Sequence, residues 1–317
     1  MEGGLLVEDG AVRRLSVEEA SAYAGEGLLW IHLEGRDEHD LDFLKTHEGI
    51  PDIAANALIA TETRPRCDQI EDGAIVNLRG PGDRDPDDSD RLVSIRMWIR
   101  KNRVTSLSRR TMAATAIVCR LTADGRILDP GDIVAAFARV ISRELDPQVA
   151  ALGDDLDKCE SELDDGNLYR LRTAIAQLRS EAIAYRRFVS PNRDALLELA
   201  GLPVEWLSDE DRLHIREAAD RFARMTEELE AVRERAALLH EQLTDLRAEQ
   251  LDQRSLLISI VAFIFLPLTF ITGLLGMNVQ GIPYAEHPFA FWGVVLFCLV
   301  VAIAVVAFFA RERWFRR

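Results

Sequence analysis

Four carboxylates recur along one stretch of the chain with the spacing of a helix face. They are Glu241, Asp245, Glu249 and Asp252. Their spacing of 4, 4 and 3 residues places them on an arc of about 80° if the stretch is helical. Such a row is often only a solvated helix face. In symmetric copies of the chain it would instead form acidic rings that concentrate cations. The residues themselves leave both interpretations open.

A second feature is a segment without any ionisable side chain. GLLGMNVQGIP, Gly273–Pro283, is uncharged although the chain contains 53 acidic and 38 basic residues. Asn278 lies in its middle, and asparagine is well suited to cap the end of a helix in a tight turn. Any further role of this amide depends on the elements that position it.

Long apolar runs lie on both sides of that segment. Ser255–Leu275 has 21 residues and Phe289–Ala310 has 22, and neither contains a charge. A helix of 21 residues is about 31 Å long, which matches the hydrocarbon core of a bilayer. We therefore predict two membrane-spanning helices, residues 255–277 and 289–310, joined by a loop over 278–288.

The arginines predict how these helices are oriented. The loop contains no Lys or Arg, whereas the tail, residues 311–317, carries four arginines. The positive-inside rule then places both chain ends in the cytoplasm and the loop outside the cell (inner) membrane.

Charge and motifs exclude two broad classes of function. The net charge is −15 for the whole chain and −17 for residues 1–254, which argues against a nucleic-acid partner and favours cations. The sequence contains no GxSxG, no HExxH and no phosphate-binding glycine loop. We therefore expect neither an enzyme nor a bound cofactor.

Residues 1–205 are predicted to form an α/β/α domain with a helical extension. Up to about Ser108 the pattern is rich in strands, with short helices near 40–47 and 51–60. A hairpin is expected at Asp72-Gly73. Helices are expected near Ile133–Leu145, Gln148–Leu163 and Leu168–Phe188, with Pro191 and Pro203 as breaks.

A long stalk helix is predicted to follow, over residues 206–254. Ser208 and Asp211 form a capping signal at its start. Apolar residues then alternate in steps of 3 and 4, as in a coiled coil, at Phe222, Met225, Leu229, Val232, Ala236, Leu239, Leu243 and Leu246. No Gly or Pro interrupts the pattern before Pro267, so the helix should continue into the first span as far as Gly276.

PLTFITGLLGMN, Pro267–Asn278, followed by a second span and a basic tail, resembles the CorA family of divalent metal-ion transporters. The family's Gly-Met-Asn signature matches Gly276, Met277 and Asn278. TRPRCDQIEDGAIVNLR, residues 63–79, is also similar to the soluble domain of the family. Within the family, Gly281 and Pro283 bring the loop closer to the ZntB zinc-transporter branch. Gln280 departs from that pattern, because a glycine is usual there.

The resemblance implies a homopentameric funnel whose first span lines a central pore. A ring of Asn278 carbonyls would then hold a hydrated dication without stripping its water. Thr269 and Gly273 would lie along the same pore, although a threonine hydroxyl often bonds back to its own helix. Leu266 and Ile258 would form a constriction, unless they pack against lipid or a neighbouring subunit. Glu286 would be the acid nearest the outer mouth.

These implications give an expected function and its alternatives. The expected function is Zn²⁺ uptake, because Tyr284 follows Pro283 where magnesium transporters more often have an acid. The alternatives are a CorA-type channel for Mg²⁺, Co²⁺ or Ni²⁺, and a non-conducting sensor or scaffold tethered to the membrane. A channel and a proton-coupled carrier would share this sequence plan. Neither span contains an ionisable residue, so a buried proton relay is absent and any proton coupling would use Glu286, His287 or the cytoplasmic acids. The sequence also identifies no regulatory metal site.

Overall fold

The structure of the 317-residue chain is a computed structural model that describes residues 3–35, 38–47, 49–61, 64–82, 92–163, 168–277, 282 and 287–311. The chain divides into two compact units, Met1–His240 and Glu241–Arg317. We describe each unit by itself.

The described part of the N-terminal unit contains one seven-stranded sheet with the order β2-β1-β3-β7-β6-β5-β4. The strands are β1 Gly3–Glu8, β2 Ala11–Leu15, β3 Leu28–Leu33, β4 Arg66–Ile70, β5 Gly73–Pro81, β6 Leu92–Arg100 and β7 Arg103–Leu107. Neighbouring strands are antiparallel except β3 and β7, which pair in parallel with Ile31 opposite Thr105.

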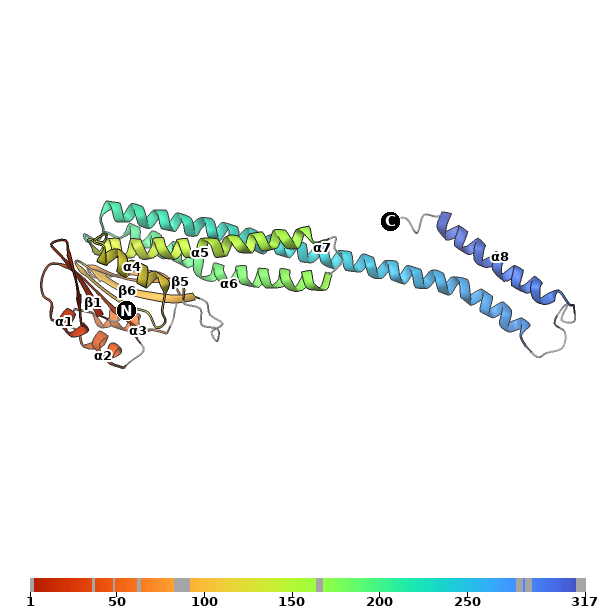
Figure 1. Cartoon of the computed structure of the whole chain (residues 1–317), viewed down its shortest axis with the longest axis horizontal. Helices are drawn as coiled ribbons and strands as arrows, with labels where there is room; N and C mark the ends of the chain where they lie inside the picture. Colours follow the sequence, from red (N-terminus) through yellow and green to blue (C-terminus); the bar gives the residue numbers. More distant parts are fainter. Residues whose placement is uncertain are drawn as a thin grey trace. The chain divides into compact units, whose positions relative to one another are not determined.

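Helices cover both faces of this sheet (Figure 1). One face carries α1 Val17–Ala22, α2 Glu38–Thr46 and α3 Asp52–Ile59; the other carries α4 Ala113–Ala123, α5 Pro130–Ser161 and α6 Leu168–Gly201. Strand β3 shows how the faces alternate. Leu29, Ile31 and Leu33 join the core under α1–α3, whereas Trp30 points the other way and contacts Phe137 of α5 with ring centroids 5.7 Å apart. The predicted α/β/α architecture is confirmed.

Helix α7 Asp209–Leu275 is a single helix of 67 residues. Ser208 begins it with a reciprocal cap, because its Oγ accepts the Asp211 backbone N–H while the Asp211 carboxylate accepts the Ser208 N–H. The predicted seam is buried from Phe222 to Leu243, whereas Leu246 is 38% exposed. Ion pairs connect α7 to its neighbours within the chain: Arg235 binds Asp157 of α5, and Glu230 binds Arg186 of α6.

The C-terminal unit consists of the end of α7 and α8 Ala290–Arg311. Both helices are long and apolar enough to cross a membrane, and almost none of their apolar windows is buried within the chain. Leu266 is 77% exposed and Phe291 is 69% exposed. Apolar surfaces of this extent require lipid or other subunits around them.

The predicted break at Pro203 is confirmed, because α6 ends at Gly201 and α7 begins at Asp209, but two other prolines do not break helices as the sequence predicted. Instead of two helices near 133–145 and 148–163, the structure has the single helix α5 with Pro147 inside it. Pro191 likewise lies inside α6, which continues to Gly201. A proline in a helix interior costs about 3 kcal/mol, and packing on both sides offsets that cost. Leu145 and Val149 are buried around Pro147, and Val189 and Asn192 around Pro191. The sequence prediction also omitted α1, α4 and the hairpin of β1 and β2.

Asn192 explains why α6 continues past Pro191. Strand β4 begins at Arg66, opposite Asn77, so the outer edge of β5 has no strand partner at Arg79. The Asn192 side chain, which is fully buried, hydrogen-bonds to both the N–H and the C=O of Arg79. Its Oδ1 accepts the Arg79 N–H at 3.0 Å, and its Nδ2 donates to the Arg79 carbonyl at 2.8 Å. One amide thus fixes the helix to the sheet.

Replacing Asn192 by Ala should destabilise the fold, because two buried backbone groups lose their partners. We expect a loss of about 2–3 kcal/mol and an apparent Tm lower by about 5 °C. The measurement is thermal unfolding of the full-length protein in detergent. Gln177→Ala, an exposed change on the same helix, is the control and should leave Tm nearly unchanged. Equal Tm values for Asn192→Ala and the wild type would contradict this account.

A buried polar network connects β3 and β7 near their carboxyl ends. His32 is 2% exposed; its Nδ1 lies 2.8 Å from Ser106 Oγ and its Nε2 lies 3.3 Å from Ser108 Oγ. Trp30 Nε1 also donates to Ser106 Oγ at 2.8 Å. Burial lowers the pKa of His32 to about 4, so its ring is neutral at physiological pH.

This lowered pKa makes the stability depend on pH. A histidine in the unfolded chain has a pKa of about 6.5, so between about pH 6.5 and 4 the unfolded state binds more protons than the folded state. The free energy of unfolding should therefore fall as the pH is lowered through that range. His32→Gln should remove up to about 1.4 kcal/mol per pH unit of this slope, measured by denaturation at several pH values. A slope identical to that of the wild type would refute the prediction, and Gln177→Ala should keep the wild-type slope.

Candidate functional site

The residues predicted to line a pore share one exposed face of α7. Ile258, Leu266, Thr269 and Gly273 all belong to this helix. At 100° per residue they fall within an arc of about 80°. Ile258 is 69% exposed and Leu266 is 77% exposed. The face presents apolar groups, one hydroxyl and one glycine, and it contains no charge.

The hydroxyl of Thr269 does not bond back to its own helix. Among the described residues it has no hydrogen-bond partner, whereas Thr272 Oγ1 donates to the Leu268 carbonyl at 2.9 Å. Ser259 Oγ bonds in the same way to the Ser255 carbonyl, also at 2.9 Å. The alternative prediction, a hydrogen bond from the Thr269 hydroxyl to a carbonyl of its own helix, is therefore wrong. Its hydroxyl is left for a partner outside the chain.

Glycines allow close approach at the end of the helix. The N–H of Gly276 bonds to the Thr272 carbonyl at 2.9 Å, and a Cβ at Gly276 would lie only 3.0 Å from that oxygen. A Cβ at Gly273 would meet nothing within 4 Å in the chain. Met277 follows and is 50% exposed. Asn278 and Glu286 lie outside the described residues.

The four predicted acids are all exposed on α7 below the apolar stretch. Glu241, Asp245, Glu249 and Asp252 make no ion pair with any residue that the structure describes. The face is free to attract cations, and within one chain it is a solvated helix face.

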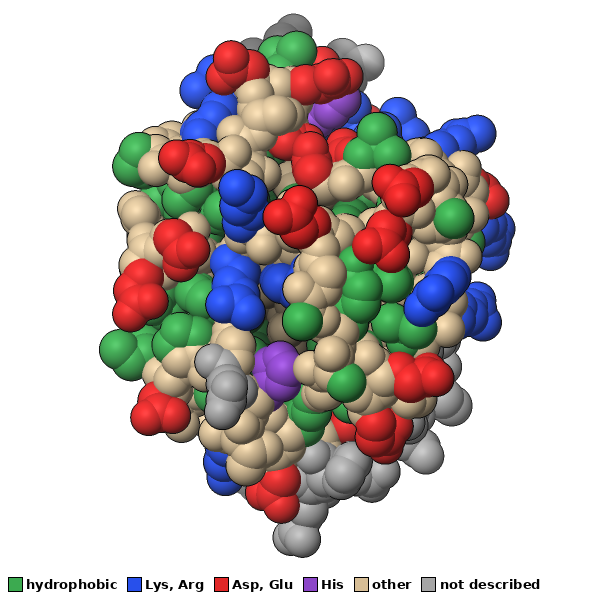
Figure 2. All heavy atoms as spheres, turned by 90° about the vertical axis from the view of Figure 1, so that its left-hand side faces the viewer, with side chains coloured by type: hydrophobic (Ala, Val, Ile, Leu, Met, Phe, Trp, Pro, Cys, Tyr) green, Lys and Arg blue, Asp and Glu red, His purple; other side chains and the backbone are tan. Residues whose placement is uncertain are grey.

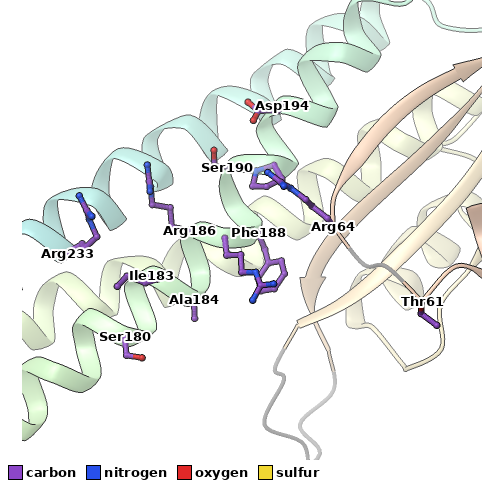
Figure 3. A pocket seen from close by; sticks show the side chains of 12 residues that line it. Thr61, Arg64, Ser180, Ile183, Ala184, Arg186, Phe188, Ser190, Asp194 and Arg233 are labelled. Atoms are coloured by element: carbon purple, nitrogen blue, oxygen red, sulfur yellow. The ribbon is translucent and has the colours of Figure 1, made fainter.

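The N-terminal unit also contains a cavity lined mainly by positively charged arginines, in contrast to the acidic face of α7. It has a volume of about 1050 Å³ and is lined by Arg64, Arg186, Arg187 and Arg233, with Asp194 nearby. Figure 3 shows that three of these arginines come from different segments: the chain before β4, α6 and α7. Glu230 pairs with Arg186 at 3.0 Å, so part of the positive charge is compensated. Such a cavity repels divalent cations and is suited to anions.

Acidic and basic side chains are interspersed on one face of this unit (Figure 2). Figure 2 shows this mixture on one end of the N-terminal unit, without a continuous basic area. Nucleic-acid binding usually requires such an area.

A cluster of three carboxylates lies where α5 and α7 begin. The carboxylate oxygens of Asp129, Asp132 and Asp211 lie within 4.8 Å of one another, a geometry that could hold a metal ion. Burial raises the pKa of Asp129 to about 6 and also raises the pKa of Asp132. Each carboxylate already accepts a backbone N–H at a helix start. Asp129 accepts the N–H of Asp132, Asp132 accepts that of Leu128, and Asp211 accepts that of Ser208. Capping accounts for all three.

The sequence did not indicate the aspartate cluster or the arginine-lined cavity. Asp129 before Pro130, and Ser208 before Asp211, are recognisable capping signals, but nothing in the sequence brings the two helix starts together. The arginine cavity likewise gathers residues more than 160 positions apart, from Arg64 to Arg233.

Comparison with known proteins gives the family. Residues 25–311 match the sequence model of the family described as CorA-like Mg²⁺ transporter protein. The chain is 30% identical over 302 residues to the zinc transport protein ZntB of Pectobacterium carotovorum, covering 94% of this chain and 91% of that protein. It is 32% identical over 304 residues to the divalent cation transporter CmaX of Pseudomonas aeruginosa, covering 91% and 88%.

Solved structures agree over nearly the whole chain. The full-length CmaX structure has a TM-score of 0.81 at 28% identity and covers 98% of this chain and 97% of that one. The complete CorA magnesium transporter of Methanocaldococcus jannaschii has a TM-score of 0.82 at 20% identity and covers 99% of both chains, which shows a shared fold. The predicted resemblance is confirmed: this chain belongs to the CorA-like family of divalent metal-ion transporters and is a membrane protein with two apolar helices.

Proposed function

We propose that this chain is the subunit of a homopentamer that carries Zn²⁺ into the cell across the inner membrane. The observation that carries the proposal is the uncharged face of α7, with Thr269 and Gly273 on it, which leads to the Gly-Met-Asn signature. A single chain leaves this face exposed, and five copies around an axis would enclose it. The relatives named as zinc transport proteins support zinc as the cargo.

The proposal assigns a role to each segment of the chain. Residues 1–205 form the cytoplasmic domain, 206–254 the stalk, and 255–277 the pore-lining span. The loop, 278–288, lies outside the membrane, and 289–310 return the chain to the basic cytoplasmic tail, 311–317. The four arginines of that tail support this orientation.

Asn278 is proposed to act through its amide oxygen. A carboxylate ring at the mouth would hold a dication too tightly for passage, whereas an amide ring can contact the ion through its water. The segment Gly273–Pro283 is uncharged, which fits this mode of selection. Met277 and Gly276 position the amide at the helix end, and Leu266 and Ile258 form the narrow apolar part below it.

Magnesium is the second candidate cargo. It is favoured by the description of the family and by the fold shared with a CorA magnesium transporter. The loop sequence favours zinc, because Tyr284, not an acid, follows Pro283. A non-conducting sensor or scaffold remains the third candidate, and it would have no need of the uncharged α7 face.

Purified protein in proteoliposomes should take up Zn²⁺ into vesicles loaded with a zinc-sensitive dye, in preference to Mg²⁺ read with a magnesium-sensitive dye. Uptake driven by voltage alone would indicate a channel, and uptake that requires a pH gradient would indicate proton coupling. Asn278→Ala should lower uptake by about tenfold or more while the pentamer still assembles, because alanine has no amide oxygen to contact the ion's water.

Asn56→Ala, an exposed change in α3, is the matched control and should keep full uptake. Magnesium flux without zinc flux would show that the transported ion is Mg²⁺ and not Zn²⁺. No flux of either ion would favour the scaffold, and full uptake by Asn278→Ala would remove the amide from the mechanism.

Neutralising the four stalk acids should lower the rate at limiting zinc. The quadruple variant Glu241→Gln, Asp245→Asn, Glu249→Gln and Asp252→Asn should reduce initial uptake by about threefold or more at low salt, and by less at high salt. Its control removes the same charge from exposed acids of the N-terminal unit, at Glu181, Glu198, Glu205 and Glu227. Equal uptake by the two quadruple variants would leave the stalk acids as a merely solvated face.

A further inference from the structure

A second cavity of the N-terminal unit lies where the two parallel strands end. It has a volume of about 490 Å³, a size typical of small-molecule sites. Glu34 follows β3, Ser108 follows β7, and both line the cavity. Helix α4, which comes directly after β7, supplies the other side.

The cavity occupies a place in the sheet where ligands commonly bind. Strands β3 and β7 are parallel neighbours. After β3 the chain continues to α2 and α3 on one face, whereas after β7 it continues to α4 on the opposite face (Figure 1). In α/β sheets such a change of side opens a crevice at the carboxyl ends of the strands, and ligands bind in that crevice.

The charges around the cavity favour an anion. Arg14, Arg110 and Arg120 line it against the single carboxylate of Glu34. Among the described residues, Arg14 and Arg120 have no ion-pair partner. This excess of positive charge stands out because residues 1–254 carry a net charge of −17. Guanidinium groups bind phosphate and carboxylate through paired hydrogen bonds.

Helix α4 adds a hydroxyl that no described residue satisfies, although the Thr115 backbone N–H bonds to the Met112 carbonyl at 3.1 Å. It has 11 residues, and its N-cap, Met112, provides no side-chain acceptor for the first-turn N–H groups. Thr115 lies in that first turn, lines the cavity and is only 6% exposed. Its Oγ1 has no hydrogen-bond partner in the part of the chain that the structure describes. A buried hydroxyl without a partner is costly unless a ligand supplies one.

The inner wall of the cavity is polar, neutral and fixed in position. His32 lines it with an uncharged ring between Ser106 and Ser108. The wall therefore offers hydroxyl and imidazole groups at the inner end, with guanidinium groups of Arg14 and Arg120 on exposed side chains. That combination suits a small anion with an uncharged body and repels a free metal cation.

We propose that this cavity binds a small phosphate monoester, with its phosphate beside Thr115 in the first turn of α4 and with the guanidinium groups of Arg14 and of Arg120, from the last turn of that helix, turned toward it. Thr115 Oγ1 donates to a phosphate oxygen, and the organic part of the ligand occupies the remaining volume beside Met112. The site is separate from the ion pathway on α7, and its existence does not depend on which metal the protein carries.

Calorimetric titration of the full-length protein in detergent tests the proposal, with adenosine 5′-monophosphate as the probe. Adenosine monophosphate should bind saturably, inorganic phosphate should displace it, and adenosine, which lacks the phosphate, should not bind. Arg14→Gln with Arg120→Gln should raise Kd by about tenfold or more. Thr115→Val, which keeps shape and charge, should raise it by about threefold or more.

The control is Arg186→Gln with Arg187→Gln, which removes the same charge from the other arginine-lined cavity and should leave Kd within a factor of two. Circular dichroism and Tm show whether each variant is folded, and Thr115→Val provides the test if the double arginine variant is not. Absence of saturable binding, equal binding of adenosine, an unchanged Kd in the folded cavity variants, or an equal loss in the control would each overturn the proposal.

Discussion

One constraint governs the second half of this protein: α7 must remain a helix while its surroundings change. From Phe222 to Leu243 its apolar residues form a narrow seam that is buried within the chain. From Ser255 to Leu275 it is apolar on all sides and almost none of it is buried. Inside a bilayer every backbone N–H and C=O must be satisfied within the helix, so this stretch tolerates no irregular break. Pro267 is accommodated inside it.

The seam also determines how the N-terminal unit is built. Helices α5 and α6 are tied to α7 by ion pairs, Arg235 with Asp157 and Arg186 with Glu230, and both helices continue across a proline. The cost of each proline is offset by buried neighbours, and for α6 by the amide of Asn192 at the edge of β5. The sheet in turn holds the start of α5 through contacts such as Trp30 against Phe137. Stability therefore depends on buried polar contacts as well as on apolar packing.

Charge is not distributed evenly over the chain. The exposed acids of α7 lie on the stretch that precedes the membrane-spanning residues, and from Ser255 to Leu275 the helix carries no charge at all. Arginines gather instead in two cavities of the N-terminal unit. An acidic protein can in this way attract dications at one surface and still offer anion-binding positions at another, because fields between exposed charges are screened within about 10 Å.

The sequence by itself determined the plan of the chain: two apolar spans, a long helix before them, an α/β/α domain and the family signature ending at Asn278. These are local patterns, set by hydrophobic period, capping residues and the thickness of a bilayer. Only the tertiary structure decided that α5 and α6 pass through their prolines, that Thr269 leaves its hydroxyl unbonded, and that Arg14 and Thr115 meet at one cavity. Such outcomes depend on contacts between residues far apart in the chain, and their energies exceed the local preferences that a sequence pattern records.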